Sequence, residues 1–372
     1  MMLPHECKAY LFETEGGELR KGMRQLPQLK EYEIMIKVMA CSLNSTDEIG
    51  RFGLLPEVRF PAPPGACVVG KVVGCGGKVM SLSMGGMKIR EGMCVTGLPM
   101  YGGLSEYVVC DARLCTELPK EWMHSKEKAM EACIDAWVGG RVHCAVMRFC
   151  EMHERMSKEE KEMCLDMCEQ MGFKGEGVFA VYGEGGAARL AIDMLKAMRD
   201  HGHHHMMSSG GKKCRIVLVT PTSKWSAEDY GIEKKDLVRA DKDNVAKELK
   251  EMGGMWWCCA TEMPTNKIEH LFDAMRYNSQ LVLLNPYKDH QLQIPVGQLL
   301  AKNISVSGAP VPHMKALRDC LDLCHKAHIK VSTHCIKFDN ENEVQSAWRS
   351  VEQNDKFGAM VVEVCPFEKM MQ

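Results

Sequence analysis

The sequence predicts an α/β protein with two domains, an irregular β-barrel and a doubly wound parallel sheet. Short segments of alternating apolar and polar residues, separated by Gly and Pro turns, fill the first 120 residues and indicate the barrel. From residue 177 onward, apolar strands alternate with helical segments, which is the pattern of a parallel sheet with crossover helices. A chain of 372 residues is long enough to give each domain its own core.

Strands of the barrel are expected where the alternation is clearest. Residues 8–14 and 33–43 are predicted as half-buried strands. Residues 60–79 carry a Pro/Gly turn followed by a further strand, and residues 95–119 carry two more around Gly102-Gly103.

After residue 120 the period becomes helical. The charged helix within 151–171 is expected to be either a solvated helix, which we favour, or a partner-binding insertion. Its expected apolar stripe is Met163, Leu165, Met167 and Met171. Later strands are predicted at 215–220, 255–261, 281–286, 303–309, 333–339 and 358–364, and later helices at 243–253, 268–278, 314–329 and 341–354.

Residues 177–198, GVFAVYGEGGAARLAIDMLKAM, join an apolar strand to a helix through a glycine-rich turn. The helix should bury one face, made by Leu190, Met194, Leu195 and Met198. The turn matches the fingerprint G-x-G-x-x-G/A, in which backbone N–H groups at a helix N-terminus bind a diphosphate. The expected binding residues are Gly183, Gly185, Gly186, Ala187 and Ala188. The alternative is a glycine-rich turn without a ligand.

Composition excludes several classes of partner. The net charge of -2 gives no broad attraction to nucleic acid or to an anionic membrane. No apolar run approaches the roughly 18 residues of a membrane span, and the first residues lack a signal-peptide core. A cytoplasmic protein with a small-molecule substrate is therefore expected. The 19 scattered cysteines, without a C-x-x-C pair, are expected to be buried thiols rather than metal ligands or disulfides.

Four histidines, His201 and His203 to His205, stand in a loop flanked by Gly and Ser. Neutral imidazoles can bind a metal. Adjacent histidines in such a loop lack a fixed geometry, so a surface loop without a metal is favoured.

Collinear motifs resemble the medium-chain dehydrogenase/reductase superfamily over nearly the whole chain. They are the segments 41–47, 64–70 and 102–109, the glycine turn, the Gly-Ala-Pro at 308–310, and the segments 343–348 and 357–364. The resemblance implies a GroES-like catalytic domain over 1–140 and 311–372. A Rossmann domain that binds a nicotinamide cofactor, over 141–310, interrupts it.

The resemblance also bears on metal binding. Zinc-dependent members carry Cys where this chain has Asn44 and His where it has Ala66, and Cys133 stands near their third ligand position. The remaining thiols are a poor tetrahedral zinc site. The chain therefore resembles the zinc-independent quinone oxidoreductases and enoyl reductases, and no metal is expected.

Candidate catalytic residues are Asn44, Thr46 and Tyr101. The resemblance implies that Asn44 lies near the nicotinamide ribose and that Thr46 occupies the place of a proton-relay hydroxyl. Equally, Asn44, Thr46 and Asp47 could simply cap the turn after a strand.

The end of the second parallel strand predicts NADPH rather than NADH. Thr220 ends this strand, and Thr222, Ser223 and Lys224 follow it without an acid. A lysine with two hydroxyl side chains suits a 2′-phosphate, whereas an acid would suit the ribose diol of NAD. Asn285, after a later strand, is expected to contact the cofactor as well.

These features together predict an NADPH-dependent, zinc-independent reductase of an activated alkene or a quinone. Trp137, Asn285 and Glu184 depart from the family pattern: Trp137 is bulky, and Glu184 brings a negative charge to the turn. The alternative is therefore a member that has lost catalysis and acts as a binding or regulatory subunit. A homodimer is expected through the edge strand near 303–307.

Overall fold

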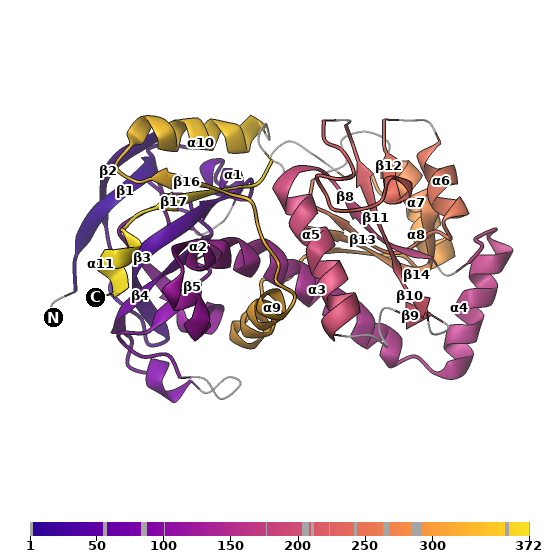
Figure 1. Cartoon of the computed structure of the whole chain (residues 1–372), viewed down its shortest axis with the longest axis horizontal. Helices are drawn as coiled ribbons and strands as arrows, with labels where there is room; N and C mark the ends of the chain where they lie inside the picture. Colours follow the sequence, from indigo (N-terminus) through magenta and orange to yellow (C-terminus); the bar gives the residue numbers. More distant parts are fainter. Residues whose placement is uncertain are drawn as a thin grey trace. The chain divides into compact units, whose positions relative to one another are not determined.

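The computed structural model describes residues 3–54, 58–82, 88–99, 101–175, 177–202, 208–209, 212–222, 224–241, 244–262, 268–284, 292–353 and 357–371. The chain forms two compact units (Figure 1). The barrel unit comprises Met1–Gly140 and Pro312–Gln372, and the sheet unit comprises Arg141–Val311.

The barrel unit contains a seven-stranded sheet in the order β16-β17-β3-β4-β5-β7, with β6 paired to β3. Its strands are β3 (Glu33–Leu43), β4 (Cys67–Cys75), β5 (Cys94–Gly97), β6 (Tyr107–Asp111), β7 (Cys115–Glu117), β16 (Thr333–Lys337) and β17 (Ala359–Glu363). A hairpin of β1 (Glu6–Phe12) and β2 (Leu19–Gln25) completes the strands. Because β17 pairs with β3, the two ends of the chain build one sheet.

Helices of the barrel unit pack around a core that includes Phe12, Ile36 and Trp348, with the Phe12 and Trp348 rings 5.2 Å apart. They are α1 (Asp47–Arg51), α2 (Lys126–Ile134), α9 (Met314–Lys326), α10 (Glu341–Gln353) and α11 (Phe367–Met371). A π-helical turn, Asp135–Gly139, follows α2. Single 3-10 turns lie at Val79–Ser81, Ala112–Leu114 and Lys120–His124.

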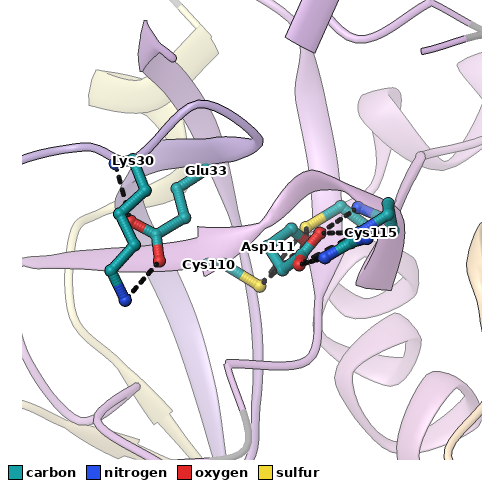
Figure 2. A network of polar contacts seen from close by, with 6 residues as sticks. Lys30, Glu33, Cys110, Asp111 and Cys115 are labelled. Atoms are coloured by element: carbon teal, nitrogen blue, oxygen red, sulfur yellow. Dashed lines mark hydrogen bonds and ion pairs between the residues drawn. The ribbon is translucent and has the colours of Figure 1, made fainter. Parts of the chain in front are cut away.

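A local polar network closes the connection from β6 to β7 (Figure 2). The Asp111 carboxylate accepts the Arg113 backbone N–H at 2.8 Å and so caps the 3-10 turn. The Cys115 thiol donates to the Asp111 carbonyl and to the Cys110 sulfur, both at 3.4 Å. At the neighbouring end of β3, the Glu33 carboxylate accepts the Lys30 N–H at 2.9 Å. These contacts fix the chain at the rim of the sheet.

The sheet unit holds a six-stranded parallel sheet in the order β12-β11-β8-β13-β14-β15. Its strands are β8 (Val178–Tyr182), β11 (Arg215–Thr220), β12 (Leu237–Arg239), β13 (Met255–Ala260), β14 (Met275–Leu283) and β15 (Ser305–Gly308). Numbered along the chain this is the order 3-2-1-4-5-6 of the Rossmann fold. The order reverses between β8 and β13, and this switch point is where such folds bind ligands.

In the described part of the sheet unit, two helices precede the first parallel strand, and four more lie between successive strands of the sheet (Figure 1). They are α3 (Gly140–Glu154), α4 (Lys158–Gln170), α5 (Gly185–Ala197), α6 (Val245–Glu251), α7 (Ile268–Ala274) and α8 (Val296–Lys302). A π-helical turn (Met198–Gly202), a 3-10 turn (Lys234–Asp236) and a short hairpin of β9 (Ser208–Ser209) and β10 (Lys212–Lys213) complete the unit. The expected α/β class and the strand–turn–helix at 177–198 are confirmed. The helix face made by Leu190, Met194, Leu195 and Met198 is buried. Among the described residues, no helix combines the length and apolar character that a membrane crossing needs.

Two sequence expectations were wrong in detail. Residues 275–278 were predicted as the end of a helix, but β14 begins at Met275 because the Arg276 side chain is buried and donates to the Gly175 and Gly253 carbonyls. The apolar stripe of α4 was also misplaced. Met163 and Leu165 are 49 % and 46 % exposed, whereas Cys164 and Cys168, four residues apart, face the core.

This correction predicts that the stability of α4 depends on its cysteines. Cys168→Ser should lower the free energy of unfolding by about 1–3 kcal/mol, because it buries a hydroxyl without a built-in partner. Met163→Ser should change it by less than about 0.5 kcal/mol, because that side chain is half exposed. Urea unfolding followed by circular dichroism measures both values. A larger loss for Met163→Ser than for Cys168→Ser would contradict the assigned face.

Candidate active site

The glycine turn lies at the switch point of the parallel sheet. Gly183 follows β8 with φ +140°, and a Cβ there would come within 2.1 Å of the Thr261 hydroxyl oxygen. Thr261 itself follows β13, so a glycine at 183 lets the ends of these two strands approach each other. Gly185, at φ +75°, begins α5, and Ala188 is fully buried beneath the turn.

The Gly183 N–H donates to the Val219 carbonyl at 3.0 Å, and side chains accept the next two N–H groups of the turn. The Glu184 N–H donates to the Glu262 carboxylate at 3.3 Å. The Gly185 N–H donates to the Tyr230 hydroxyl oxygen at 3.0 Å. Gly186 and Ala187 follow in the first turn of α5. A backbone N–H in the first turn of a helix has no helical carbonyl four residues earlier to which it could donate. Their N–H groups are the donors that the turn can offer to an incoming anion.

Tyr230 is held in place by the segment around it. Arg189 of α5 donates to the Asp229 carbonyl at 2.6 Å, and Lys196 donates to the Gly231 carbonyl at 2.6 Å. Tyr230 is fully buried. Burial, with the charges of Glu184 and Glu262, raises the pKa of its phenol above the ordinary value. Tyr230 is therefore a fixed, neutral wall of the turn.

The end of β11 carries polar groups that are tied to the same turn. Thr220 is buried and donates to the Thr222 carbonyl at 2.9 Å, so its hydroxyl supports the loop rather than facing a ligand. The Thr222 hydroxyl donates to the Glu184 carboxylate. Lys224 is exposed, with its ammonium 4.5 Å from the centre of the Trp225 ring.

Arg239 adds a second cation at this place. It ends β12, pairs with Thr220 in the sheet and donates to the Thr222 carbonyl at 3.3 Å. Sequence reasoning missed Arg239, although a short apolar strand ending in Arg beside β11 was a usable signal. Ser223 and Asn285, both expected to bind the cofactor, lie outside the described residues.

The residues that follow β11 contain no acid, as the sequence analysis stated, but an acid from another loop lies beside them. The tertiary structure brings Glu184 there from the glycine turn, where its carboxylate meets Thr222. Glu262 was also missed, because its approach to the turn depends on the pairing of β13 with β8.

A nicotinamide dinucleotide fits most of this arrangement. The turn geometry, the two remaining N–H groups and the cations Lys224 and Arg239 suit a diphosphate and a 2′-phosphate. Glu262 is the exception, because its carboxylate holds a donor that the diphosphate would use. The residues therefore fit the nucleotide once Glu262 leaves the Glu184 N–H.

In the barrel unit, Asn44 and Asp47 form the turn that follows β3. The Asp47 carboxylate accepts the N–H groups of Asn44 at 2.9 Å and of Gly65 at 2.8 Å. Burial raises the pKa of Asp47 to about 7, although these N–H donors and that of Ala66 oppose the shift. Asn44 donates through its side-chain amide to the Ser42 hydroxyl at 2.9 Å. Asp47 and the Asn44 backbone therefore cap the turn, as the alternative interpretation expected. The side-chain carbonyl of Asn44 is the group with which this residue can bind a ligand.

Thr46 and Tyr101 both contact α1, Thr46 as its N-cap residue and Tyr101 through Gly50. The buried Trp137 indole donates to the Thr46 hydroxyl at 3.3 Å. The Tyr101 ring lies against Gly50, where a Cβ would come within 1.8 Å of the ring. The Tyr101 hydroxyl is buried without a hydrogen-bond partner among the described residues. Burial and the charge of Asp47 raise the pKa of Tyr101, so it remains a neutral donor.

Cys133, near the third ligand position of the zinc-dependent family members, lies among other buried cysteines. Cys133 is fully buried and donates to the Ala40 carbonyl at 3.5 Å. Burial, with Cys67 and Cys41 beside it, raises the pKa of Cys133 far above that of a free thiol. A metal needs thiolates. Across the described ranges, no three His, Cys, Asp or Glu side chains group as a metal site would require. His201 is exposed, and His203 to His205 lie outside these ranges.

Asp135, at the start of the π-helical turn, is a fully buried carboxyl. Neither of its oxygens meets an N–H or O–H donor within the described residues, and the Cys324 thiol lies beside it. Burial and the charge of Glu131 raise the pKa of Asp135 to about 8, against the weaker effects of Lys128 and Cys324. The carboxyl is therefore mostly protonated at neutral pH.

Comparison with known proteins gives one family model and several relatives. The model of the alcohol dehydrogenase GroES-like domain matches residues 30–120. A probable cinnamyl alcohol dehydrogenase 2 of Nicotiana tabacum is 23 % identical over 361 residues, covering 89 % of this chain and 88 % of the relative. The chloroplastic NADPH-dependent alkenal/one oxidoreductase of Arabidopsis thaliana is 32 % identical over 127 residues, covering 32 % of each.

Among solved structures, a quinone oxidoreductase of Pseudomonas syringae pv. Tomato DC3000 superposes with a TM-score of 0.68 at 15 % identity. The match covers 96 % of this chain and 100 % of that one. The fold is therefore that of a GroES-like domain combined with a Rossmann domain, as expected.

The buried Asp135 predicts a pH-dependent stability. Its folded pKa exceeds its unfolded pKa, so its contribution is fully present below the unfolded value near 3.8 and is lost as the pH rises toward about 8. From pH 5 to pH 7, the free energy of unfolding of the wild type should fall by about 1–3 kcal/mol more than that of Asp135→Asn. Denaturant titrations measure this slope. Asp166→Asn, at an exposed position, serves as the control and should retain the wild-type slope. Parallel slopes for wild type and Asp135→Asn would refute the assignment.

Proposed function

We propose that this chain, a member of the medium-chain dehydrogenase/reductase superfamily, is an NADPH-dependent and zinc-independent reductase of an activated alkene or a quinone. NADPH supplies the hydride. The observation that carries the proposal is the glycine turn at the switch point of a 3-2-1-4-5-6 sheet, with Lys224 and Arg239 at the neighbouring strand ends.

The choice of NADPH rests on the charge at the end of β11. Lys224 belongs to the loop that follows Thr222, with its ammonium 4.5 Å from the centre of the Trp225 ring, and the Arg239 guanidinium donates to the Thr222 carbonyl at 3.3 Å. Guanidinium and ammonium groups bind a phosphate by charge-assisted hydrogen bonds. Glu184 opposes this preference, because its carboxylate lies at Thr222 and would suit a ribose diol. We expect the two positive charges to determine the cofactor preference in spite of the one carboxylate. The Arabidopsis relative is named as an NADPH-dependent oxidoreductase.

The choice of acceptor rests on the donors of the barrel unit. By the resemblance, Asn44 and Ala66 stand where zinc-dependent members have metal ligands, and Cys133 is a buried thiol that donates to the Ala40 carbonyl. An acceptor that needs only hydrogen-bond donors for its developing negative charge is then favoured, as in enones and quinones. The names of the Arabidopsis and Pseudomonas proteins point the same way, whereas the tobacco relative is named an alcohol dehydrogenase.

We assign a role in the reaction to each of the three candidate residues of the barrel unit, based on the hydrogen bonds that its side chain makes. Tyr101 donates its O–H to the developing oxyanion, because burial keeps the phenol neutral. Thr46 accepts from Trp137, which orients its own hydroxyl proton toward a second acceptor. Asn44 uses its side-chain carbonyl to accept a ribose hydroxyl, because its amide is committed to Ser42.

A second candidate is a non-catalytic binding or regulatory subunit. The observation that favours it is the occupation of the turn by Glu262 and Tyr230. A thermal shift with NADPH separates the two candidates, because a bound ligand stabilises the native state by mass action. A clear shift supports the reductase, and no shift with either NADPH or NADH supports the non-catalytic subunit.

We also propose a cytoplasmic homodimer. All 19 cysteines are free thiols, as a reducing compartment would keep them. Strand β15 lies at the edge of the six-stranded sheet, and edges favour pairing with another strand. On α8, Val296 and Leu300 are 62 % and 79 % exposed, four residues apart on one helix face. A second copy of the chain that pairs along β15 would cover the exposed Val296 and Leu300 side chains.

The cofactor assignment predicts that Lys224→Ala and Arg239→Ala each weaken NADPH binding about tenfold, because each removes a phosphate contact of about 1.4 kcal/mol. NADH binding should change less than about twofold. Isothermal titration measures both constants, with Lys234→Ala as the control because this lysine is 86 % exposed in the same unit. Equal losses for NADPH and NADH would argue against a 2′-phosphate site.

The acceptor assignment predicts turnover with an alkenal or a quinone and little with a saturated ketone. Tyr101→Phe should lower kcat about 10- to 100-fold with NADPH binding unchanged, because it removes one donor to the oxyanion. Loss of reduced-nicotinamide absorbance across an acceptor panel measures the rates. No turnover with any acceptor, despite NADPH binding, would reject the reductase.

The homodimer predicts that Leu300→Glu shifts the chain to a monomer, because it places a charge in an apolar contact. Light scattering during gel filtration measures the mass. Leu54→Glu, at a site 51 % exposed in the barrel unit, should leave the dimer intact. A wild-type protein that is monomeric in this experiment would contradict the proposed homodimer.

A further inference from the structure

A carboxylate of the protein itself, that of Glu262, accepts an N–H group of the glycine turn. We infer that Glu262 competes with the nucleotide diphosphate for the Glu184 N–H, so that it sets how tightly this chain binds a dinucleotide. The inference rests on the proposed function for the identity of the nucleotide. It concerns a residue that neither the fingerprint nor the strand pattern assigned.

Glu262 reaches the turn because of the sheet register. Ala260, the last residue of β13, pairs with Tyr182, the last residue of β8. Both strands therefore end at the same level, and Glu184 and Glu262 stand two residues beyond these ends. The contact between Thr261 and Gly183 brings the two loops together. The Glu262 carboxylate then accepts the Glu184 N–H at 3.3 Å.

The arrangement resembles that of a bound anion. Backbone N–H groups at a helix N-terminus, together with the helix dipole, stabilise a negative charge. Glu262 supplies such a charge from within the chain, and Glu184 adds a second carboxylate on the side of Thr222. A diphosphate placed on the same donors would meet both carboxylates at short range. Binding therefore requires that Glu262 move away or become neutral.

Glu262 is the group that can leave, because its bond is the weaker of the two at the turn. It is half-buried, and its hydrogen bond of 3.3 Å is long for a charged acceptor. Tyr230, in contrast, is fully buried at 3.0 Å, and Arg189 and Lys196 hold the residues beside it.

The test measures binding rather than turnover. Full-length wild type, Glu262→Gln and Glu262→Ala are titrated calorimetrically with NADPH and with adenosine 2′-monophosphate, which lacks the diphosphate. Removing the charge should lower the Kd for NADPH at least about tenfold, with the Kd for adenosine 2′-monophosphate changed less than about twofold. Glu251→Gln is the matched control, because Glu251 is 67 % exposed on α6 of the same unit. If Glu262→Gln fails to fold, Glu262→Ala gives the same comparison.

The outcomes separate this inference from the proposed function. If the wild type binds NADPH weakly and the Glu262 variants bind it tightly, both stand. If only the variants bind, the inference stands and the wild type is a silenced, non-catalytic member. If wild type and variants bind equally, Glu262 is no competitor and the inference is overturned. If none of them binds, the inference and the reductase both fall.

Discussion

The close approach of β8 and β13 at their carboxyl ends is the constraint on which the rest of the sheet unit depends. Gly183 makes this approach possible, because any larger residue would collide with Thr261. The approach aims the N-terminus of α5 into the switch point of the sheet, as a dinucleotide fold requires. The same approach brings Glu262 to the Glu184 N–H. One packing contact thus creates both the site and its internal competitor.

The distribution of charge around this contact gives the site two distinct ends. After β11 and at the end of β12, Lys224 and Arg239 supply the positive charges to which we attribute the proposed preference for a phosphate on the adenosine ribose. At the turn, Glu184 and Glu262 oppose the diphosphate by their charge. A nucleotide is therefore attracted at one end and resisted at the other, so its affinity depends on how easily Glu262 is displaced. This balance accounts for a chain that keeps the dinucleotide fingerprint while departing from the family pattern at several positions.

Sequence reasoning worked where the local pattern decides the structure. Periodicity identified the strand–turn–helix at 177–198, and alternation located β3. It failed where distant segments meet. The absence of an acid after β11 was a statement about neighbours in sequence, whereas Glu184 arrives from another loop. The buried face of α4 was predicted only in part: Cys164 and Cys168 are buried, as expected of the cysteines, whereas Met163 and Leu165 were wrongly placed on an apolar stripe.

The barrel unit shows the same division between local and tertiary information. The turn after β3 was recognised from its polar residues, and capping of that turn by Asp47 follows from residue type. The contact of Trp137 with Thr46 and the packing of Tyr101 on Gly50 join residues that lie far apart in the chain. The hydrophobic periodicity of the sequence does not indicate contacts of this kind. The candidate residues were therefore named from the sequence, but their contact partners became known only from the fold.

The most direct measurement is a crystal structure of the full chain grown with NADPH. The account predicts the diphosphate on the N–H groups of Glu184, Gly186 and Ala187, with the Glu262 carboxylate turned away and the 2′-phosphate between Lys224 and Arg239. A nucleotide bound at the turn while Glu262 still accepts the Glu184 N–H would contradict it, as would a nucleotide bound elsewhere.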